Sequence, residues 1–281
     1  MRWFLALIHL ILLICPCALC YGQTSFSSVS GEGGYAAMKG SVKLDLDNGF
    51  ILMPYGGYYR PSDMEGADQY ATGKAGLQVS YDVNDVSQIL VRADYIPKRA
   101  GFERTNYAVG ARAELCYHCG IFTHSYIQVS AGQSFYKITP YESIYKDKLQ
   151  TRSSIIQIET GTNIGKFTLQ ASYEKVLKYT HRPTLQTESY WAEIPFMTAI
   201  IQGFVEGVGA AKLSYHTRWI TPYGICARYK YTTDGAYVTA WGAGLSLHWG
   251  KTTLSGGVEN FESDSESDRQ NYFSFSASME F

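Results

Sequence analysis

The 281-residue chain carries little charge and no excess of either sign. Only 17% of its residues are charged, and 24 Lys and Arg stand against 25 Asp and Glu, which gives a formal charge of −1. Nucleic-acid-binding domains are usually strongly basic, so this balance argues against a nucleic-acid partner. The apolar share of 46% and the aromatic share of 15% exclude a disordered chain, because burial of that surface can offset the entropy lost on ordering.

Long apolar runs are also missing, except at the extreme N-terminus. A membrane-spanning helix needs about 18 or more consecutive apolar residues, and no segment after residue 22 provides them. At the N-terminus, Arg2 precedes an apolar stretch from Trp3 to Ile14, and small residues lead to Gly22. This arrangement is typical of a secretory signal peptide. We therefore expect a signal peptide over residues 1–22 and an exported domain over residues 23–281.

Cysteine is scarce in the expected exported domain. Only Cys116, Cys119 and Cys226 remain there, which is too few for a disulfide scaffold. Cys116 and Cys119 flank a short turn, and His118 is the only other metal-ligand type close by. The spacing therefore favours a small local disulfide, or two unpaired thiols, in an oxidising compartment over a redox or metal centre. We expect neither a metal nor a cofactor.

The chain is instead rich in tyrosine, glycine and regular alternation, with 23 Tyr and 27 Gly. Apolar and polar residues alternate over segments of about ten to thirteen residues, longer than the strands of soluble sheets and suited to tilted transmembrane strands. Clear examples span residues 70–81, 88–97, 107–117, 167–174 and 219–231. Their apolar faces tend to end in interfacial aromatic residues, namely Tyr95, Tyr117, Tyr173, Tyr215, Trp219, Tyr231, Tyr237 and Trp249. The pattern predicts an all-β fold, a transmembrane antiparallel up-and-down β-barrel.

The connections between these segments alternate in length. Short links are separated by longer polar ones at residues 61–69, 98–105, 137–150, 181–198 and 262–270. Such asymmetry is typical of outer-membrane barrels, whose periplasmic turns are short and external loops longer. Thirteen segments are recognisable from Tyr35 onward, and an even number requires another strand near Thr24–Ser30. We therefore predict about 14 strands, with 12 as the alternative if two segments merge.

The C-terminal segment carries the one resemblance to a known class. Phe273, Phe275, Ala277, Met279 and Phe281 fall on one face, and the chain stops on phenylalanine. This resembles the C-terminal assembly signal of Gram-negative outer-membrane β-barrel proteins. The resemblance implies insertion into the cell outer membrane by the barrel-assembly machinery, among outer-membrane lipid and lipopolysaccharide. Size and strand rhythm are similar to small monomeric porins and YaiO-type barrels, but no motif selects a narrower family or an oligomeric state.

Charged residues on the polar faces of the strands are the candidates for a pore lining. Basic and acidic positions nearly balance, so no ion preference follows. The candidates are Lys39, Lys43, Lys74, Arg92, Asp94, Arg112, Glu114, Glu159, Glu174, Arg228 and Lys230, with Asp45 and Glu259 beside them. We expect a porin-type channel for small solutes. A non-conducting structural or surface-adhesion barrel is the alternative.

An outer-membrane hydrolase acting on lipid or peptide is a weaker alternative. His181 lies near Glu188 and Ser189 in a long link, but no strained turn or oxyanion donor accompanies the three residues. We therefore assign no catalytic residue. The inside–outside phase itself predicts that Leu77→Arg and Val91→Arg disrupt the barrel, whereas Lys74→Ala is tolerated.

Overall fold

The computed structural model describes residues 21–31, 35–46, 48–61, 71–99, 102–138, 149–181, 204–232, 235–263 and 269–281. These residues form fourteen strands: β1 (Tyr21–Gly31), β2 (Tyr35–Asp45), β3 (Phe50–Pro61), β4 (Thr72–Asn84), β5 (Ser87–Arg99), β6 (Phe102–Cys119), β7 (Phe122–Ile138), β8 (Leu149–Ile164), β9 (Phe167–Tyr179), β10 (Val205–Tyr215), β11 (Ile220–Tyr231), β12 (Tyr237–Trp249), β13 (Thr252–Ser263) and β14 (Gln270–Glu280). The expected signal-peptide residues before Tyr21 lie outside the described residues.

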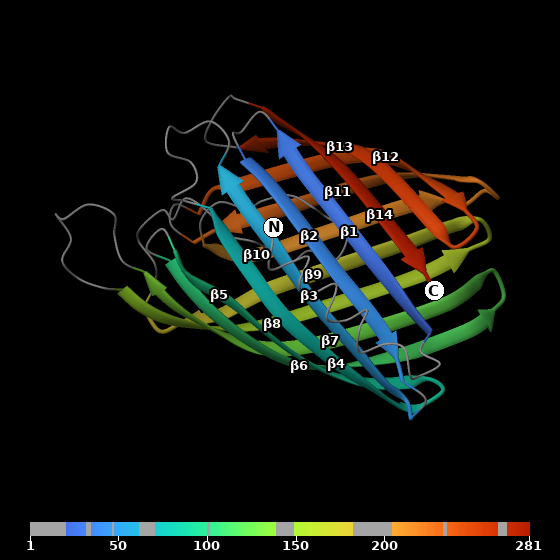
Figure 1. Cartoon of the computed structure of the whole chain (residues 1–281), viewed down its shortest axis with the longest axis horizontal. Coiled ribbons are helices and arrows are strands. Elements are labelled where there is room, and N and C mark those ends of the chain that lie inside the picture. The colour runs from blue at the N-terminus through green and yellow to red at the C-terminus, as the bar shows by residue number, and fades with distance from the viewer. Residues whose placement is uncertain are drawn as a thin grey trace.

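The strands close into one antiparallel barrel (Figure 1). Each strand pairs with its neighbours in sequence, and β14 pairs with β1, with Phe26 opposite Ala277. The predicted barrel and its fourteen strands are confirmed, including the weakly patterned first strand, which runs over Tyr21–Gly31. No helix among the described residues is long and apolar enough to span a membrane.

The two ends of the barrel differ. One end, which we call the turn end, carries the start of β1, the end of β14 and the connections after β2, β4, β6, β8, β10 and β12. The other end, the loop end, carries the connections after the odd-numbered strands. The expected long link at residues 98–105 is wrong, because β5 continues to Arg99 and β6 begins at Phe102. Cross-strand pairing of Arg99 with Phe102 extends this hairpin into the segment expected to be a loop.

Alternation along the strands separates an apolar outer surface from a polar interior. Leu77, Val91 and Val109 are 45%, 53% and 55% exposed on the outside, while Lys74 and Asp94 on the same sheet are buried inside. A barrel in lipid requires this arrangement, because its outer surface faces acyl chains and its lumen faces water.

Tyrosine and glycine, the two abundant residue types, are paired across strands. Tyr55 faces Gly76, and a side chain added at Gly76 would collide with the tyrosine ring. The same holds for Tyr126 over Gly161 and for Tyr223 over Gly244. An aromatic ring that lies flat across a facing glycine covers its exposed backbone. The lumen therefore keeps more open volume than upright tyrosine side chains would leave.

Strand β11 has the opposite phase from the one expected. Ile225, Ala227 and Tyr229 are buried inside the barrel, so Arg228 and Lys230 project from the outer surface. Both faces of residues 220–226 are apolar or small. The alternation there therefore does not indicate which face of the strand points into the lumen. Tyr231, expected in an outer aromatic girdle, packs against the interior apolar cluster instead.

Candidate functional site

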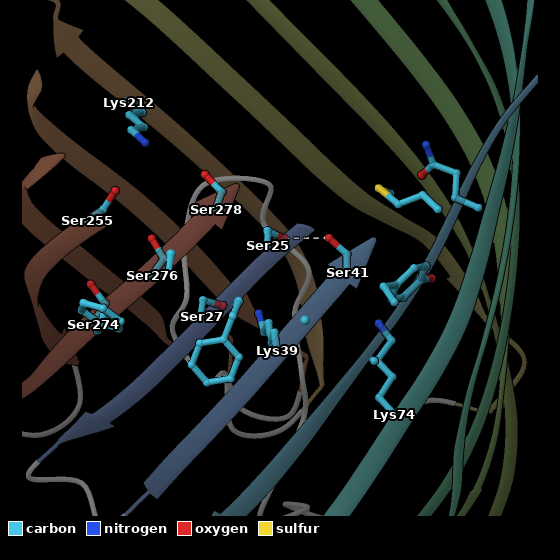
Figure 2. A pocket seen from close by; sticks show the side chains of 18 of the residues that line it. Ser25, Ser27, Lys39, Ser41, Lys74, Lys212, Ser255, Ser274, Ser276 and Ser278 are labelled. Carbon is cyan, nitrogen blue, oxygen red and sulfur yellow. Dashed lines mark hydrogen bonds between the residues drawn. The ribbon is translucent and has the colours of Figure 1, made fainter. Parts of the chain in front are cut away.

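The lumen contains a cavity of about 590 Å³ with one wall rich in serine. Alternate positions of β1 and β14 project inward, because every second residue of a strand shares a face, and serine occupies the inward positions at the middle of both strands. Figure 2 shows these hydroxyls around one space. The contributing serines are Ser25, Ser27, Ser41, Ser255, Ser274, Ser276 and Ser278. The wall offers small groups that both donate and accept hydrogen bonds.

Charged side chains reach the same cavity from other strands. Lys39 of β2, Lys212 of β10 and Glu259 of β13 line it, and Glu259 is electrostatically coupled to both lysines. Lys74, Arg92 and Glu159 complete the charged lining. The cavity thus presents both signs of charge together with neutral hydroxyls.

A buried ionic network centred on Asp94 forms part of the lumen wall. The Asp94 carboxylate lies 3.0 Å from Arg104 Nη2 and 3.7 Å from Lys74 Nζ. It also accepts hydrogen bonds from Asn106 Nδ2 at 3.0 Å and Tyr55 Oη at 3.2 Å. The side chains of Asp94, Lys74 and Arg104 are only 0%, 2% and 4% exposed. Lys74 is therefore a structural partner of Asp94, and the sequence-based expectation that Lys74→Ala is tolerated no longer holds.

The remaining inward charges form smaller groups. Arg112 Nη2 lies 2.9 Å from Glu114, and Tyr126 Oη donates to Glu159 at 2.7 Å. Glu174 lines a small secondary cavity with Arg92 and Arg104. Of the eleven pore-lining candidates, the structure places nine inside, namely Lys39, Lys43, Lys74, Arg92, Asp94, Arg112, Glu114, Glu159 and Glu174. The assignment of Arg228 and Lys230 to the lumen is corrected, because the inverted phase of β11 turns them outward.

An apolar layer lines the lumen near the loop end and was not expected from the sequence. Phe204 packs edge-to-face on Tyr136 at 5.2 Å, and Phe261 packs in the same way on Tyr272 at 5.1 Å. Val29, Ile96, Val205, Val208 and Tyr229 belong to the same buried cluster. These residues are the inward positions at the loop ends of their strands. The lumen is therefore polar at mid-height and apolar towards the loop end.

Histidines and threonines are linked at the turn end. The His216 ring is within 2.8 Å of Thr168 Oγ1 and 3.3 Å of Thr221 Oγ1, and Thr221 Oγ1 is 2.9 Å from His248 Nε2. Burial, followed by nearby His248 and Lys212, keeps the pKa of His216 below its ordinary value. The ring nitrogens bond threonine hydroxyls, an arrangement that lacks the carboxylate of a catalytic triad.

Of the three residues in the weaker hydrolase alternative, only His181 lies within the described residues. The backbone of His181 bonds the hydroxyl of Thr151, whose Oγ1 donates to the His181 carbonyl at 2.6 Å. Glu188 and Ser189 lie outside the described residues. Within the described ranges, no group of three or more His, Cys, Asp or Glu side chains is arranged to hold a metal ion.

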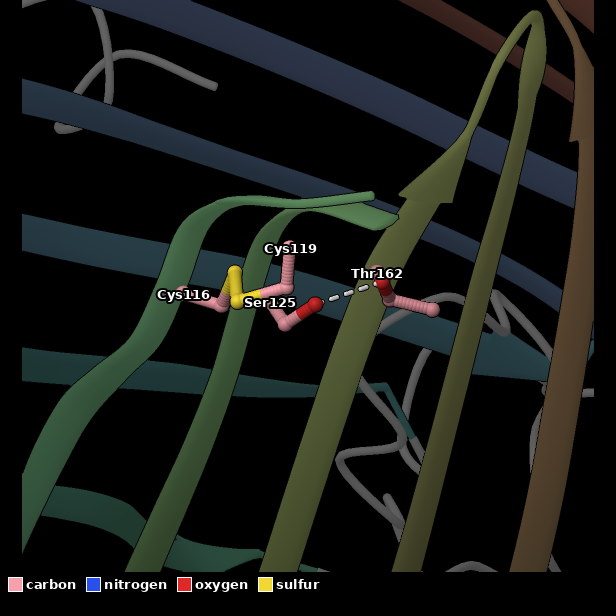
Figure 3. Close-up of a disulfide and its surroundings, with 4 residues drawn as sticks. All are labelled: Cys116, Cys119, Ser125 and Thr162. Carbon is pink, nitrogen blue, oxygen red and sulfur yellow. Dashed lines mark hydrogen bonds between the residues drawn. A yellow bond between two sulfur atoms is a disulfide. The ribbon is translucent and has the colours of Figure 1, made fainter. Parts of the chain in front are cut away.

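A disulfide joins Cys116 and Cys119 at the turn end of β6 (Figure 3). The bond adjoins a register shift between Glu114 and Cys116 in the pairing of β6 with β7. Beside it, Ser125 and Thr162 share a hydrogen bond of 2.6 Å. The disulfide therefore holds the irregular end of this hairpin in one shape.

Replacing both cysteines with serine should have only a small effect. The crosslink closes a loop of few residues, so its loss is expected to lower the free energy of unfolding by about 2 kcal/mol at most. Urea unfolding of the barrel in lipid vesicles measures this value, with Cys226→Ser as the matched control. Failure of the double variant to reach the folded gel band would contradict a purely local role.

The C-terminal strand closes the barrel. Phe281 donates its backbone N–H to the Gly22 carbonyl at 2.9 Å and accepts one from Gly22 at 3.2 Å. Phe273, Phe275 and Phe281 project from the outer surface and are exposed there. Their role as an assembly signal remains a prediction.

Comparison with known proteins rests on structure alone. No family model and no curated protein sequence matches the chain. The CymD monoaromatic hydrocarbon channel superposes with a TM-score of 0.51 at 9% identity, over 93% of this chain and 88% of that one. The chain has the fold of an outer-membrane β-barrel.

Two further solved structures cover nearly the whole barrel. A loop-deletion mutant of OmpT, an outer-membrane protein of Vibrio cholerae, matches with a TM-score of 0.47 at 10% identity, over 93% of this chain and 98% of that one. OccK9 of Pseudomonas aeruginosa matches with a TM-score of 0.43 at 8% identity, over 94% and 99% of the two chains.

Proposed function

We propose that the protein is a channel for small hydrophilic solutes in the outer membrane of a Gram-negative bacterium, with its turn end towards the periplasm. The cavity of about 590 Å³ inside a closed fourteen-stranded barrel carries this proposal. A barrel of about eight strands is filled by its own side chains, whereas wider barrels leave internal space. The short turns, the start of β1 and the end of β14 lie at one end, which matches the periplasmic side of bacterial barrels.

The lining indicates which solutes suit the channel. Serine hydroxyls together with lysine and glutamate side chains replace the hydration of a polar solute as it passes. The apolar layer near the loop end favours solutes small enough to pass a less hydrated zone. The cavity wall carries both signs of charge, with Lys39, Lys74, Arg92 and Lys212 against Glu159 and Glu259, which supports passage of neutral polar molecules and of small ions.

Planar-bilayer recording of the purified, folded barrel tests the proposal. We expect stepwise conductance increments, and swelling of protein-containing liposomes in solutions of small sugars. Heat-modifiable mobility on a gel establishes that the sample is folded. A folded barrel that produces neither steps nor swelling would contradict the channel and support the non-conducting structural alternative.

The charge at Lys39 should influence ion selectivity. Lys39→Glu places a carboxylate on the cavity wall beside Glu259, so the reversal potential in a KCl gradient is expected to shift towards cation selectivity. Arg60→Glu is the matched control. It makes the same change in the sign of the side-chain charge, but at a residue on the exposed outer side of β3. Equal shifts in both variants would show that the cavity does not lie on the conduction path.

A further inference from the structure

The tip of the β6–β7 hairpin gathers two histidines beside the disulfide. The Cys116–Cys119 bond lies at the end of β6 (Figure 3), and His118 stands between its two cysteines in the sequence. The rings of His118 and His124 have their centroids 6.3 Å apart. Both histidines and Cys119 are exposed, so dissolved ions reach them. Four side chains of the types that bind zinc and softer metal ions therefore lie on one hairpin tip.

His124 holds a backbone conformation that side chains rarely adopt. Its φ is 51°, and among the described residues other than glycine it alone has a positive φ. A left-handed backbone at such a residue costs about 1–3 kcal/mol, and this kind of strain collects at functional sites. The pairing of β7 with β8 also shifts register between Thr123 and Tyr126. His124 is thus set outside the regular ladder of β7, with its ring beside that of His118.

His124 supplies the ligand that sequence spacing did not. From the sequence, His118 was the only other metal-ligand type close to the cysteines, which argued against a metal centre. With His124 the set becomes two thiols and two imidazoles, the combination of many tetrahedral zinc sites. Two imidazoles on one zinc ion have ring centroids about 5 Å apart, because each Zn–N bond measures about 2.0–2.1 Å. Rotation of two exposed histidine side chains covers the remaining difference.

The disulfide itself is open to reduction. Cys119 is exposed and Cys116 is half-buried, and exposed disulfides are the ones that thiolates attack most readily. The bond closes a loop with a sequence separation of only three, so its loss changes the stability of the barrel little. Reduction therefore leaves a folded barrel with two thiols at the hairpin tip.

We propose that the reduced hairpin tip binds Zn²⁺ through Cys116, Cys119, His118 and His124. In the disulfide form the two sulfurs are bonded to each other, and the described residues hold no group of three or more side chains arranged for a metal. A dithiol reductant supplies two electrons and two protons, becomes a disulfide and leaves two thiols at the tip. Zn²⁺ then displaces both thiol protons and forms two Zn–S bonds, while each neutral imidazole contributes a lone pair. The site lies on a connecting hairpin, so it does not depend on the proposed channel.

Zinc binding to the folded barrel in detergent, before and after reduction, tests the proposal. A water-soluble phosphine reduces the disulfide, is oxidised to the phosphine oxide, and is removed under argon before metal is added. We expect about one tightly bound Zn²⁺ per reduced barrel and no such site on the oxidised barrel, in a titration against a zinc-binding dye. Co²⁺ in place of Zn²⁺ should give the charge-transfer absorption of thiolate ligation. Bound zinc should also protect both thiols from alkylation, as counted by mass spectrometry.

Variants separate this site from other zinc-binding residues. On the reduced barrel, His124→Ala and the double variant Cys116→Ser/Cys119→Ser should each weaken zinc binding about tenfold or more, because only three or two ligands remain. His216→Ala and Cys226→Ser are the matched controls, since they remove an imidazole and a thiol outside the hairpin tip, and both should bind zinc as the wild type does. Heat-modifiable gel mobility establishes that each sample is folded.

Equal zinc affinity of the oxidised and reduced barrels would overturn the proposal, as would an unchanged affinity in His124→Ala. Loss of the folded gel band on reduction alone would overturn it as well, because the site requires a folded barrel with free thiols. Conductance of the oxidised barrel is measured separately, so failure of zinc binding and failure of the channel remain distinguishable.

Discussion

Replacing Asp94 with asparagine is expected to destabilise the barrel by about 3–5 kcal/mol, the usual cost of removing one partner from a buried ionic network. The carboxylate is fully buried and lies between Arg104 and Lys74, whose side chains are almost fully buried as well. Asparagine keeps the size of the side chain but removes the carboxylate that lies between the two cations. The change also weakens the hydrogen bonds from Tyr55 and Asn106.

Urea unfolding in lipid vesicles, followed by tryptophan fluorescence, measures this loss. Asp94→Asn combined with Lys74→Met should recover part of the stability, because it also removes one of the two buried cations that contact Asp94 and replaces it with an apolar side chain of similar length. Lys43→Met is the matched control. Lys43 forms an ion pair with Asp45 in which both side chains are 41% exposed, and such exposed pairs contribute only about 0–1 kcal/mol.

If Asp94→Asn lowers the free energy of unfolding by less than the Lys43→Met control does, water in the lumen hydrates the Asp94 network. Lys74→Ala belongs to the same test. With Lys74 absent, Asp94 retains Arg104, so a smaller loss than for Asp94→Asn is expected. Equally negligible effects of Asp94→Asn, Lys74→Ala and Lys43→Met on the free energy of unfolding would contradict the structural role assigned to the network.

Much of the fold could be predicted because strand alternation in lipid obeys a simple rule. Residues 70–81 and 107–117 expose one apolar face to acyl chains, so Leu77 and Val109 could be assigned to the outside from spacing alone. The first strand was recovered from the requirement for an even number, although Thr24–Ser30 carries few large apolar residues. The disulfide followed from two cysteines around a turn in an oxidising compartment.

The phase of β11 could not be predicted for a physical reason. Ile225, Ala227 and Tyr229 face an interior apolar layer, whereas small residues such as Gly224 and Cys226 face the membrane. Apolar character therefore marks the inside of this strand, whereas on the adjoining β12 large apolar residues such as Trp241 and Leu245 mark the outside. Only packing against Val208 on the adjacent strand β10 and Phe261 on β13 identifies the inner face, and that packing depends on residues distant in sequence.

The serine wall was missed because the prediction of pore-lining residues considered only charge. In the terminal strand the serines alternate with apolar residues, and only the apolar face was assigned a role from the sequence. The serines are Ser274, Ser276 and Ser278, and the apolar residues beside them are Phe273, Phe275 and Ala277. The pattern was visible in the sequence. By contrast, convergence of Lys39, Lys212 and Glu259 on the same cavity requires closure of the barrel, which brings β2, β10 and β13 to a common space.

Leu77→Arg is expected to prevent stable insertion, with a cost of about 2–4 kcal/mol for arginine near the membrane midplane. Leu77 lies at the middle of β4 on the outer face, is 45% exposed there and is opposite Pro54 and Ala93 on the adjoining strands. Arginine at this depth must either remain unsolvated or distort the surrounding lipid. The folded fraction in vesicles, read from heat-modifiable gel mobility, measures the effect.

Gln78→Arg is the matched control, because residue 78 is the next position along the same strand and lines the cavity instead. It lies opposite Arg92, so some like-charge repulsion is expected, but water and salt in a hydrated lumen screen it. We therefore expect Gln78→Arg to fold with a loss below about 1 kcal/mol, a magnitude typical of solvent-screened charges. Similar failure of both variants would show that the lumen at this height excludes water, which would weaken the barrel's assignment as a channel as well as its inside–outside phase.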